Sequence, residues 1–244
     1  MFSEVLERGV FLRRKLGILG LLVLLVCAVI GSQKAGEYLH QNYLDRETKE
    51  TAAAAGAKEK QVVVVDAGHG GFDSGKVGVN QALEKDLNLQ IANKVKTMLE
   101  KQGIKVIMTR KDENSLASSK VEDMKTRVSI INQEKPSLAV SIHQNSYTQE
   151  SIHGAQVFYF THSKEGEKSA KVMQEALLAA DPENTRQAKA NDTYYMLKKT
   201  NSPVIIVECG FLSNKAEADK LTTEEYQNAL TEAICKGVQD YLSQ

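Results

Sequence analysis

In the last three quarters of the chain, short runs of apolar residues alternate with segments in which apolar residues recur every fourth position. Val62–Val65 is a continuous β-branched run, which is typical of a strand buried on both faces. From Leu83 to Leu99 an apolar residue stands at every fourth position. That spacing predicts an amphipathic helix that ends at Gly103.

The same two patterns continue to the end of the sequence. Further strands are predicted at Lys105–Thr109, Leu138–Ile142, Ala155–Phe160 and Val204–Val207, and further helices at Glu122–Glu134, Glu165–Ala180 and Thr223–Leu242. Because strands and helices alternate, the sequence predicts an α/β fold. Its central sheet is expected to be mostly parallel (mixed) and flanked by helices on both faces.

The first 60 residues follow a different pattern. No residue from Leu16 to Gln33 is charged, a run of 18 positions. As a helix this run would extend for about 27 Å, enough to cross the hydrocarbon core of a bilayer. The basic residues that precede it predict a cytoplasmic tail (1–15), a transmembrane signal anchor (16–33), a polar stalk (34–60) and an extracytoplasmic domain (61–244). The chain is thus expected in the cell membrane as a single-pass protein.

Other interpretations of this apolar run compete with the anchor. A cleaved signal peptide is the main alternative, with Val29-Ile30-Gly31 as a poor cleavage site. A core helix is disfavoured because the run is apolar on every face. A lipoprotein attached at Cys27 is disfavoured because Val26 before it is not small.

Composition narrows the classes of function. The 31 basic and 31 acidic residues cancel, so charge gives no reason to expect nucleic acid as a partner. With 25% charged and 42% hydrophobic residues the chain is globular in composition. Cys27 lies in the apolar run, which leaves Cys209 and Cys235. The sequence alone does not decide whether those two are bridged.

Polar residues follow three of the predicted strands. Asp66 to Gly71 follow the first, His143-Gln144-Asn145 follow another, and Glu208-Cys209-Gly210 follow a third. Ligands of open α/β sheets bind beyond the carboxyl ends of the strands. His69, His143 and Glu208 are therefore expected at one edge, with Glu84 near it at the start of a helix.

Two histidines and two glutamates at one edge suggest zinc. Imidazole nitrogens and carboxylate oxygens suit this metal, and a catalytic zinc takes three protein ligands and a water. The fourth group would act as a general base. The competing interpretation is structural, because one histidine after a strand, or one glutamate at a helix start, commonly has only a local role.

A second glycine-rich pattern points elsewhere. Gly70, Gly75 and Lys76 satisfy G-x-x-x-x-G-K after a strand, as in a phosphate-binding loop. Val77 stands where the loop needs a Ser or Thr hydroxyl, and no helix is predicted to start at Lys76. A nucleotide site is therefore disfavoured.

Four ordered motifs resemble one family. They are Asp66-Ala67-Gly68-His69-Gly70-Gly71, Leu83-Glu84-Lys85, Ser141-Ile142-His143-Gln144-Asn145, and Val207-Glu208-Cys209-Gly210-Phe211-Leu212-Ser213-Asn214. The domain resembles the zinc-dependent N-acetylmuramoyl-L-alanine amidases of bacterial cell walls, type 3. The similarity extends from Val62 to Tyr241. The family often has proline where this chain has Ala67, a position that carries no ligand.

The resemblance implies a site and a reaction. It implies one Zn²⁺ per chain, with His69, Glu84 and His143 as ligands and Glu208 as the catalytic residue. The reaction implied is hydrolysis of the amide between N-acetylmuramic acid and L-alanine in peptidoglycan. Two segments, 184–189 and 194–197, further resemble the spore germination-specific branch, which implies a role in the spore cortex.

Two alternatives to this function stay open. One is a zinc peptidase or deacetylase that acts on another cell-wall bond. The other is a membrane-anchored peptidoglycan-binding domain that lacks catalysis or depends on an activating protein. The expected partners are peptidoglycan, the cytoplasmic membrane through the N-terminal helix, and an unidentified activating protein.

The sequence also indicates roles for several residues besides the three implied ligands and Glu208. Asn145 and Arg186 are candidate substrate contacts, with a turn and a solvated loop as their structural alternatives. Arg127 is expected to pair with a surface acid. Cys209 is expected to be a buried small hydrophobe that points away from Glu208. The loop 182–200 is expected to cover the substrate groove.

Overall fold

The computed structural model describes residues 61–244, together with Lys34 and Gly36. Apart from those two residues, the predicted tail, anchor and stalk lie outside the described residues, and they stay predictions. Among the residues that the structure describes, no helix is both long and apolar enough to cross a membrane.

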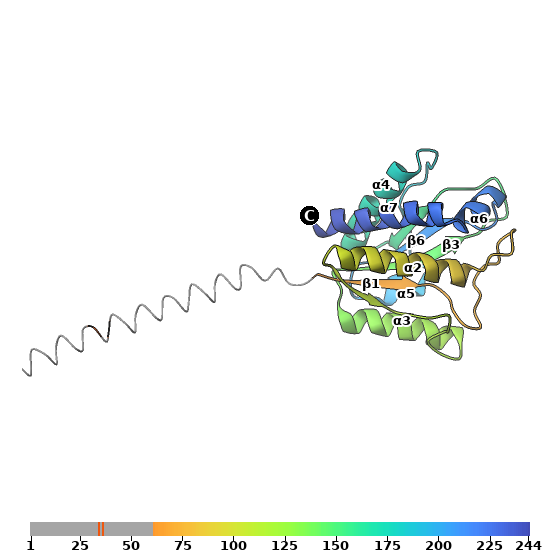
Figure 1. Cartoon of the computed structure of the whole chain (residues 1–244). Helices are drawn as coiled ribbons and strands as arrows, with labels where there is room; N and C mark the ends of the chain where they lie inside the picture. The colour runs from red at the N-terminus through yellow and green to blue at the C-terminus, as the bar shows by residue number, and fades with distance from the viewer. Residues whose placement is uncertain (1–33, 35, 37–60) are drawn as a thin grey trace, which may run out of the picture. The chain divides into compact units, whose positions relative to one another are not determined.

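A six-stranded sheet forms the centre of the domain, in the order β2-β1-β3-β6-β4-β5 (Figure 1). The strands are β1 (Val62–Ala67), β2 (Lys105–Met108), β3 (Leu138–Asn145), β4 (Gln156–Phe160), β5 (Lys189–Asn191) and β6 (Val204–Phe211). All neighbouring pairs are parallel except β4 and β6, which are antiparallel. The prediction of a mostly parallel, mixed sheet is confirmed.

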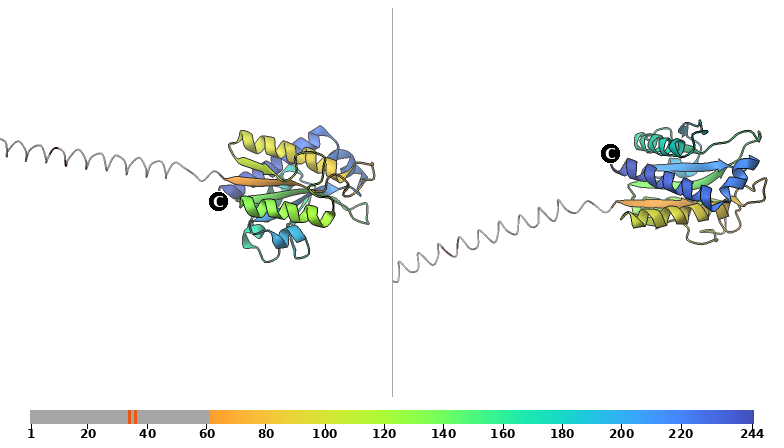
Figure 2. Two further views of the ribbon diagram at one scale, coloured as in Figure 1. Left: turned by 90° about the horizontal axis from the view of Figure 1, so that it is seen from below. Right: turned by 45° about the horizontal axis from the view of Figure 1, so that its top comes forward.

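Helices cover both faces of this sheet (Figures 1 and 2). They are α2 (Glu84–Lys101), α3 (Lys120–Glu134), α4 (Lys164–Ala180), α5 (Tyr195–Lys199), α6 (Lys215–Leu221) and α7 (Glu224–Leu242). The larger apolar cluster joins the sheet to α2, α4 and α7. The smaller cluster joins the opposite face to α3 and α5.

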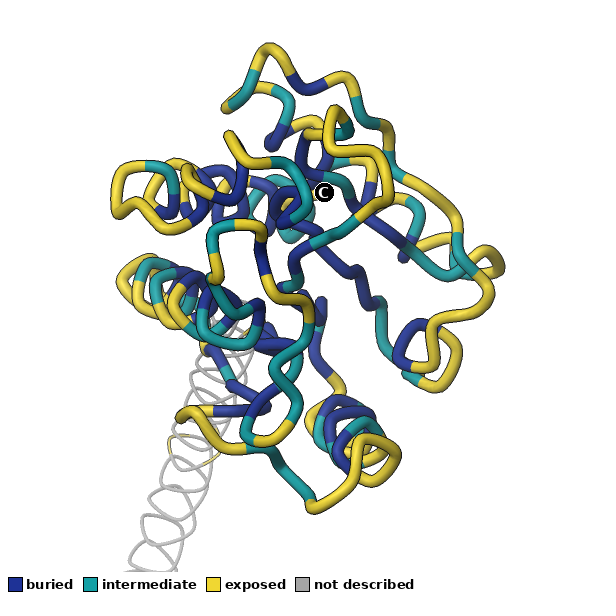
Figure 3. Tube along the Cα trace, turned by 90° about the vertical axis from the view of Figure 1, so that its right-hand side faces the viewer, coloured by how far each residue is buried: buried dark blue, intermediate teal, exposed yellow. Residues whose placement is uncertain are grey.

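The β-branched residues of β1 pack into the apolar clusters on both faces of the sheet. Val63 and Val65 pack in the larger cluster, while Val64 packs in the smaller one. Successive side chains of a strand point to opposite faces, so an unbroken apolar run is needed where both faces are buried. The tube coloured by burial shows buried segments at the centre of the domain and exposed segments around them (Figure 3).

The structure extends two predicted strands and adds three short elements. β3 continues to Asn145 and β6 to Phe211, so His143 and Glu208 lie within strands and not after them. The segment 182–200, predicted as a loop, contains β5 and α5. The helix α6 was also missed, because none of these elements is long enough to show a periodic apolar pattern.

Both described cysteines are free. Cys209 and Cys235 are buried thiols on β6 and α7. The question that the sequence left open is therefore answered: they form no bridge.

Candidate metal centre and active site

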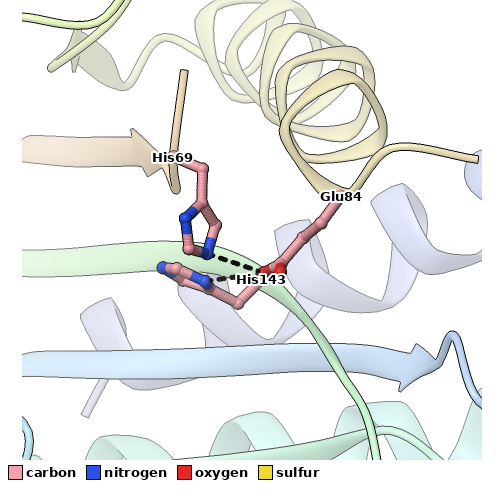
Figure 4. Close-up of side chains that lie close together, drawn as sticks. All are labelled: His69, Glu84 and His143. Carbon is pink, nitrogen blue, oxygen red and sulfur yellow. Dashed lines mark hydrogen bonds and ion pairs between the residues drawn. The ribbon is translucent and has the colours of Figure 1, made fainter. Parts of the chain in front are cut away.

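Three potential metal ligands converge at one edge of the sheet (Figure 4). His69 follows β1, Glu84 is the first residue of α2, and His143 lies in β3. Oε1 of Glu84 lies 3.2 Å from Nε2 of His69 and 2.9 Å from Nδ1 of His143. The candidate ligand atoms all lie within 4.8 Å of one another. The residues predicted to share this edge are brought together.

Glu208 stands beside this cluster. It pairs in register with His143 across the parallel strands β6 and β3, so both side chains leave the same face of the sheet. Its carboxylate is buried, and no described residue donates a hydrogen bond to Oε2. Burial raises the pKa of Glu208 to about 7. A carboxyl group with such a pKa can both accept and return a proton near neutral pH.

A cavity of about 540 Å³ opens over the four residues. It is of the size that small-molecule sites commonly have. Polar residues and a patch of apolar side chains share the lining, which comprises His69, Asp73, Gly75, Lys76, Glu84, Lys120, Met124, Ser141, His143, Gln144, Asn145, Ser146, Tyr194, Tyr195, Met196, Ile206 and Glu208.

The charges of the cluster are strongly coupled. Burial alone would lower the pKa of His143, but the hydrogen bond and charge of Glu84 outweigh it and raise that pKa to about 9. Burial would raise the pKa of Glu84, and the two histidines outweigh it and lower that pKa. Without a bound metal, a proton on His143 thus balances the carboxylate of Glu84.

The donor set suits zinc. Nδ1 of His69 lies 2.8 Å from Oδ2 of Asp73, which leaves Nε2 facing Glu84. Such a carboxylate behind a histidine fixes the ring and its tautomer in metal sites. Two imidazoles and one carboxylate are a common set for catalytic zinc. Since a buried Glu208 oxygen without a hydrogen bond lies in the same cavity, the residues present fit a metal with a water beside it.

Two glycines make room for the ligands. A Cβ on Gly68 would lie 2.2 Å from the ring of His143. Gly75 has φ of +64°, and a Cβ there would lie 2.5 Å from Oε2 of Glu84. Any larger residue at either position would displace a candidate ligand.

The G-x-x-x-x-G-K segment forms backbone hydrogen bonds with Glu84 in the structure. The backbone N–H of Lys76 donates to Oε2 of Glu84 (2.8 Å), and the carbonyl of Lys76 accepts from the N–H of Glu84 (3.0 Å). No helix starts at Lys76. The glycine-rich loop therefore binds a carboxylate of the chain itself.

Arg127 corrects a sequence prediction. It does not pair with a surface acid, because only 1% of its side chain is exposed. Its guanidinium pairs with Asp66 (Nη1 to Oδ1, 2.8 Å) and with Asp123 (Nε to Oδ2, 2.6 Å). The helix α3 turns this residue toward the sheet, beneath the loop that carries His69.

The two candidate substrate residues differ in position. Asn145 lines the cavity, and its Oδ1 accepts the N–H of Ser146 (2.8 Å). Arg186 is not among the lining residues. Its guanidinium lies 4.9 Å from the centre of the Phe211 ring, and its Nε donates to the carbonyl of His153.

Cys209 lies next to Glu208 but is buried and free. Burial raises the pKa of its thiol, so it is not poised as a nucleophile. This agrees with the prediction of a small buried hydrophobe.

The segment 182–200 reaches the site through its second half. Tyr194, Tyr195 and Met196 line the cavity, and the Tyr194 ring packs edge-on against Phe158. This segment therefore contributes to the cavity wall, and the expectation that it covers the groove stays a prediction.

Sequence reasoning missed Asp73 and Lys120. Lys120 lies 2.7 Å from Oδ1 of Asp73, and both line the cavity. Burial would raise the pKa of Asp73, but its hydrogen bonds with Lys120 and His69 lower it to about 2. Asp73 stands four positions after His69, and this short separation could have indicated the histidine–carboxylate pair. Nothing in the sequence indicated that Lys120 would lie beside Asp73.

Comparison with known proteins settles the family. The model of the family described as N-acetylmuramoyl-L-alanine amidase matches residues 63–240. The chain belongs to this amidase family. The family resemblance that the four motifs indicated is thereby confirmed. The family match also supports amidase activity for this chain.

The amidase has relatives of similar length. It is 37% identical over 192 residues to the germination-specific N-acetylmuramoyl-L-alanine amidase of Bacillus subtilis (strain 168). The aligned region covers 75% of this chain and 81% of the relative. The CwlD amidase from Clostridioides difficile, solved in complex with the GerS lipoprotein, matches with a TM-score of 0.72 and 38% identity, over 75% of this chain and 98% of that one.

A further solved relative is the catalytic domain of CwlV from Bacillus (Paenibacillus) polymyxa var. colistinus. It matches with a TM-score of 0.68 and 31% identity, over 75% of this chain and 98% of that one. The amidase domain of this chain thus has the α/β fold of the solved family members.

Proposed function

We propose that this amidase is a zinc hydrolase that cleaves the bond between the lactyl group of N-acetylmuramic acid and L-alanine of the stem peptide. The observation that carries the proposal is the meeting of His69, Glu84 and His143 with the buried Glu208 in one cavity. The family match supports the same bond class.

The residues of the chain have distinct roles in this proposal. His69, Glu84 and His143 would hold the metal, which when bound supplies a Lewis acid and lowers the pKa of water beside it. Glu208 accepts the proton of the attacking water, since burial holds its pKa near 7. The same carboxyl group then returns the proton to the leaving amine of L-alanine.

Asn145 is the supported candidate for substrate orientation. Its Oδ1 accepts the backbone N–H of Ser146, and the residue lines the cavity, so its amide Nδ2 is the group that would donate to a substrate. A peptide carbonyl is the acceptor that this donor suits. The role of Arg186 as a substrate contact stays a prediction, because its guanidinium is occupied by Phe211 and His153.

A spore-related role and a protein partner extend the proposal. A relative at 37% identity is a germination-specific amidase, and another relative was solved in complex with a lipoprotein. We therefore propose that this amidase acts on spore cortex and that a protein partner activates it. The uncharged run 16–33 supports retention in the membrane with the catalytic domain outside.

The chemical groups released from peptidoglycan test which bond is cut. Zinc-loaded residues 61–244 should release peptides with a new L-alanine amine and leave glycans with a newly free lactyl carboxyl group. Release of acetate would indicate a deacetylase, and new termini inside the stem peptide would indicate a peptidase. Binding without any product, alone and with a candidate partner, would indicate a binding module.

Zinc content tests the metal site independently of activity. Purified residues 61–244 should carry about one zinc per chain, and His69→Ala should lose it. Lys171→Ala, on the exposed face of α4, is the matched control and should keep the metal. Equal zinc in wild type and His69→Ala would contradict the assignment of His69 as a ligand.

A further inference from the structure

Helix α3 reaches the loop of His69 through a buried side chain. Arg127 Nη1 donates to the carbonyl oxygen of Ala67 (2.6 Å), and its Nη2 donates to the carbonyl oxygen of His69 (2.5 Å). These two acceptors lie on the turn between β1 and the ligand. The planar guanidinium of Arg127 therefore binds the backbone on both sides of the turn that leads to the His69 imidazole.

The backbone of His69 needs such support. Its φ is +62°, a left-handed conformation that a non-glycine residue adopts at a cost. The conformation persists where the surroundings determine it. The hydrogen bond from Arg127 to the His69 carbonyl is one such determinant, and the bond from Nδ1 of His69 to Asp73 is the other.

A set of acceptors fixes Arg127 in turn. The carboxylate of Asp66 accepts a hydrogen bond from Nη1 of Arg127. The same carboxylate accepts hydrogen bonds from the hydroxyl groups of Thr109 and Ser141, each at 2.5 Å. Asp123, one turn earlier on α3, takes Nε. The guanidinium thus lies between two carboxylates, and its orientation toward the His69 loop is fixed from both sides.

A second buried guanidinium binds the same turn from another direction. Arg110 donates to the carbonyls of Ala67 and Gly68 and, at 2.8 Å, to that of Lys85 at the start of α2. It joins the β1 turn to the residue after Glu84, but its hydrogen bonds do not include His69. Arg127 is the buried cation with a direct hydrogen bond to the ligand residue.

We infer that Arg127 is a positioning residue for the metal ligand His69, and that it sets the affinity of the site for zinc. It is not among the candidate ligands and does not line the cavity, so it acts through the backbone of His69. The inference rests on the zinc site proposed above. A purely structural role would make Arg127 matter for stability alone, whereas positioning makes it matter for metal binding at equal stability.

The test is a zinc titration of residues 61–244 against a chromophoric chelator, with thermal unfolding measured on the same samples. Arg127→Lys keeps the charge beside Asp66 but loses the planar fork. Val128→Ala is the matched control, since it removes buried volume from the adjacent residue of α3 without touching the His69 turn. Asp123→Asn is a milder variant, because its amide oxygen can still accept the N–H of Leu116.

Arg127→Lys should weaken zinc binding by about tenfold or more, the scale typical of groups that orient metal ligands. Asp123→Asn should weaken it less and in the same direction. Val128→Ala should lower the unfolding temperature and leave the zinc affinity unchanged. With Co²⁺ in place of zinc, the visible spectrum should change in Arg127→Lys and not in Val128→Ala.

The inference is overturned if the folded Arg127→Lys and Asp123→Asn variants bind zinc as wild type does. It is also overturned if Val128→Ala weakens zinc to the same extent at the same loss of stability. Failure of the wild type to bind zinc would instead contradict the zinc site itself, which separates the two proposals.

Discussion

At the scale of single residues, the charge state of the site depends on the contact between His143 and Glu84. Their side chains lie 2.9 Å apart, and the carboxylate keeps a proton on the imidazole up to about pH 9. Nδ1 of His143 is the atom that faces Glu84. In the zinc site proposed above, the metal and this proton would therefore compete for the same imidazole.

That competition predicts how zinc affinity varies with pH. The folded, metal-free protein has a raised His143 pKa, about 9, so the imidazolium dominates below that value. Zinc binding then releases the proton of His143, so the affinity should rise with pH toward pH 9. Chelator competition between pH 6.5 and 10 measures this dependence. An affinity independent of pH across that range would contradict it.

The shared edge was predictable because the strands expected from the sequence end shortly before His69, His143 and Glu208, and because Glu84 begins an expected helix. His69, Glu84, His143 and Glu208 stand at points where strands and helices meet the same sheet edge. Arg127 could not be placed in this way, because its partners Asp66 and His69 are 61 and 58 positions away. Nothing local distinguishes it from a solvated helix arginine.

At the scale of elements, α6 connects β6, the strand that contains Glu208, to the loop before β4. The buried carboxylate of Glu217 accepts the backbone N–H of Phe211 (2.8 Å) and of Gly154 (2.9 Å). Phe211 is the last residue of β6, three positions after Glu208. Burial raises the pKa of Glu217, as expected for a carboxylate inside the fold.

Removal of this carboxylate should destabilise the domain. Glu217→Ala leaves two buried N–H groups without acceptors, which costs about 1–3 kcal/mol per group. The free energy of unfolding in urea measures the effect. Asp219→Ala, an exposed position of the same helix, is the control and should change it little. Equal stability of the two variants would argue against the bridging role of Glu217.

Long elements were predictable and short ones were not. The period of four over α2 and the apolar run of β1 gave their type and position, because burial selects those patterns directly. The three residues of β5 are largely exposed and have no pattern. A signal for α6 was present, since Asn214 caps the helix at Glu217, but the helix is too short to show a periodicity.

At the scale of the whole domain, the site and the entry of the chain lie at opposite ends of the same strand. Residue 61 precedes β1, while His69 follows it. Gln61 donates to the carbonyl of Leu242 near the end of α7, so both ends of the domain meet at the edge away from the site. A tether attached before residue 61 would therefore join the domain at the end of β1 opposite to His69.

The proposed anchor can be tested on the full chain. Full-length protein should sediment with membranes and keep its N-terminal residues, while a variant without residues 1–33 should stay in the soluble fraction. External protease should digest the catalytic domain of the full-length protein in intact spheroplasts. A soluble product that begins after residue 31 would instead support the cleaved signal peptide.

The most direct test of the account is the turnover of a defined muropeptide by zinc-loaded wild type and Glu208→Gln, with zinc content measured in the same samples. Glutamine is nearly isosteric but cannot accept the proton of water. The account predicts about one zinc in both proteins and a loss of turnover of about 100-fold or more in the variant. Full turnover by a Glu208→Gln variant that contains zinc would contradict the role of Glu208 as general base.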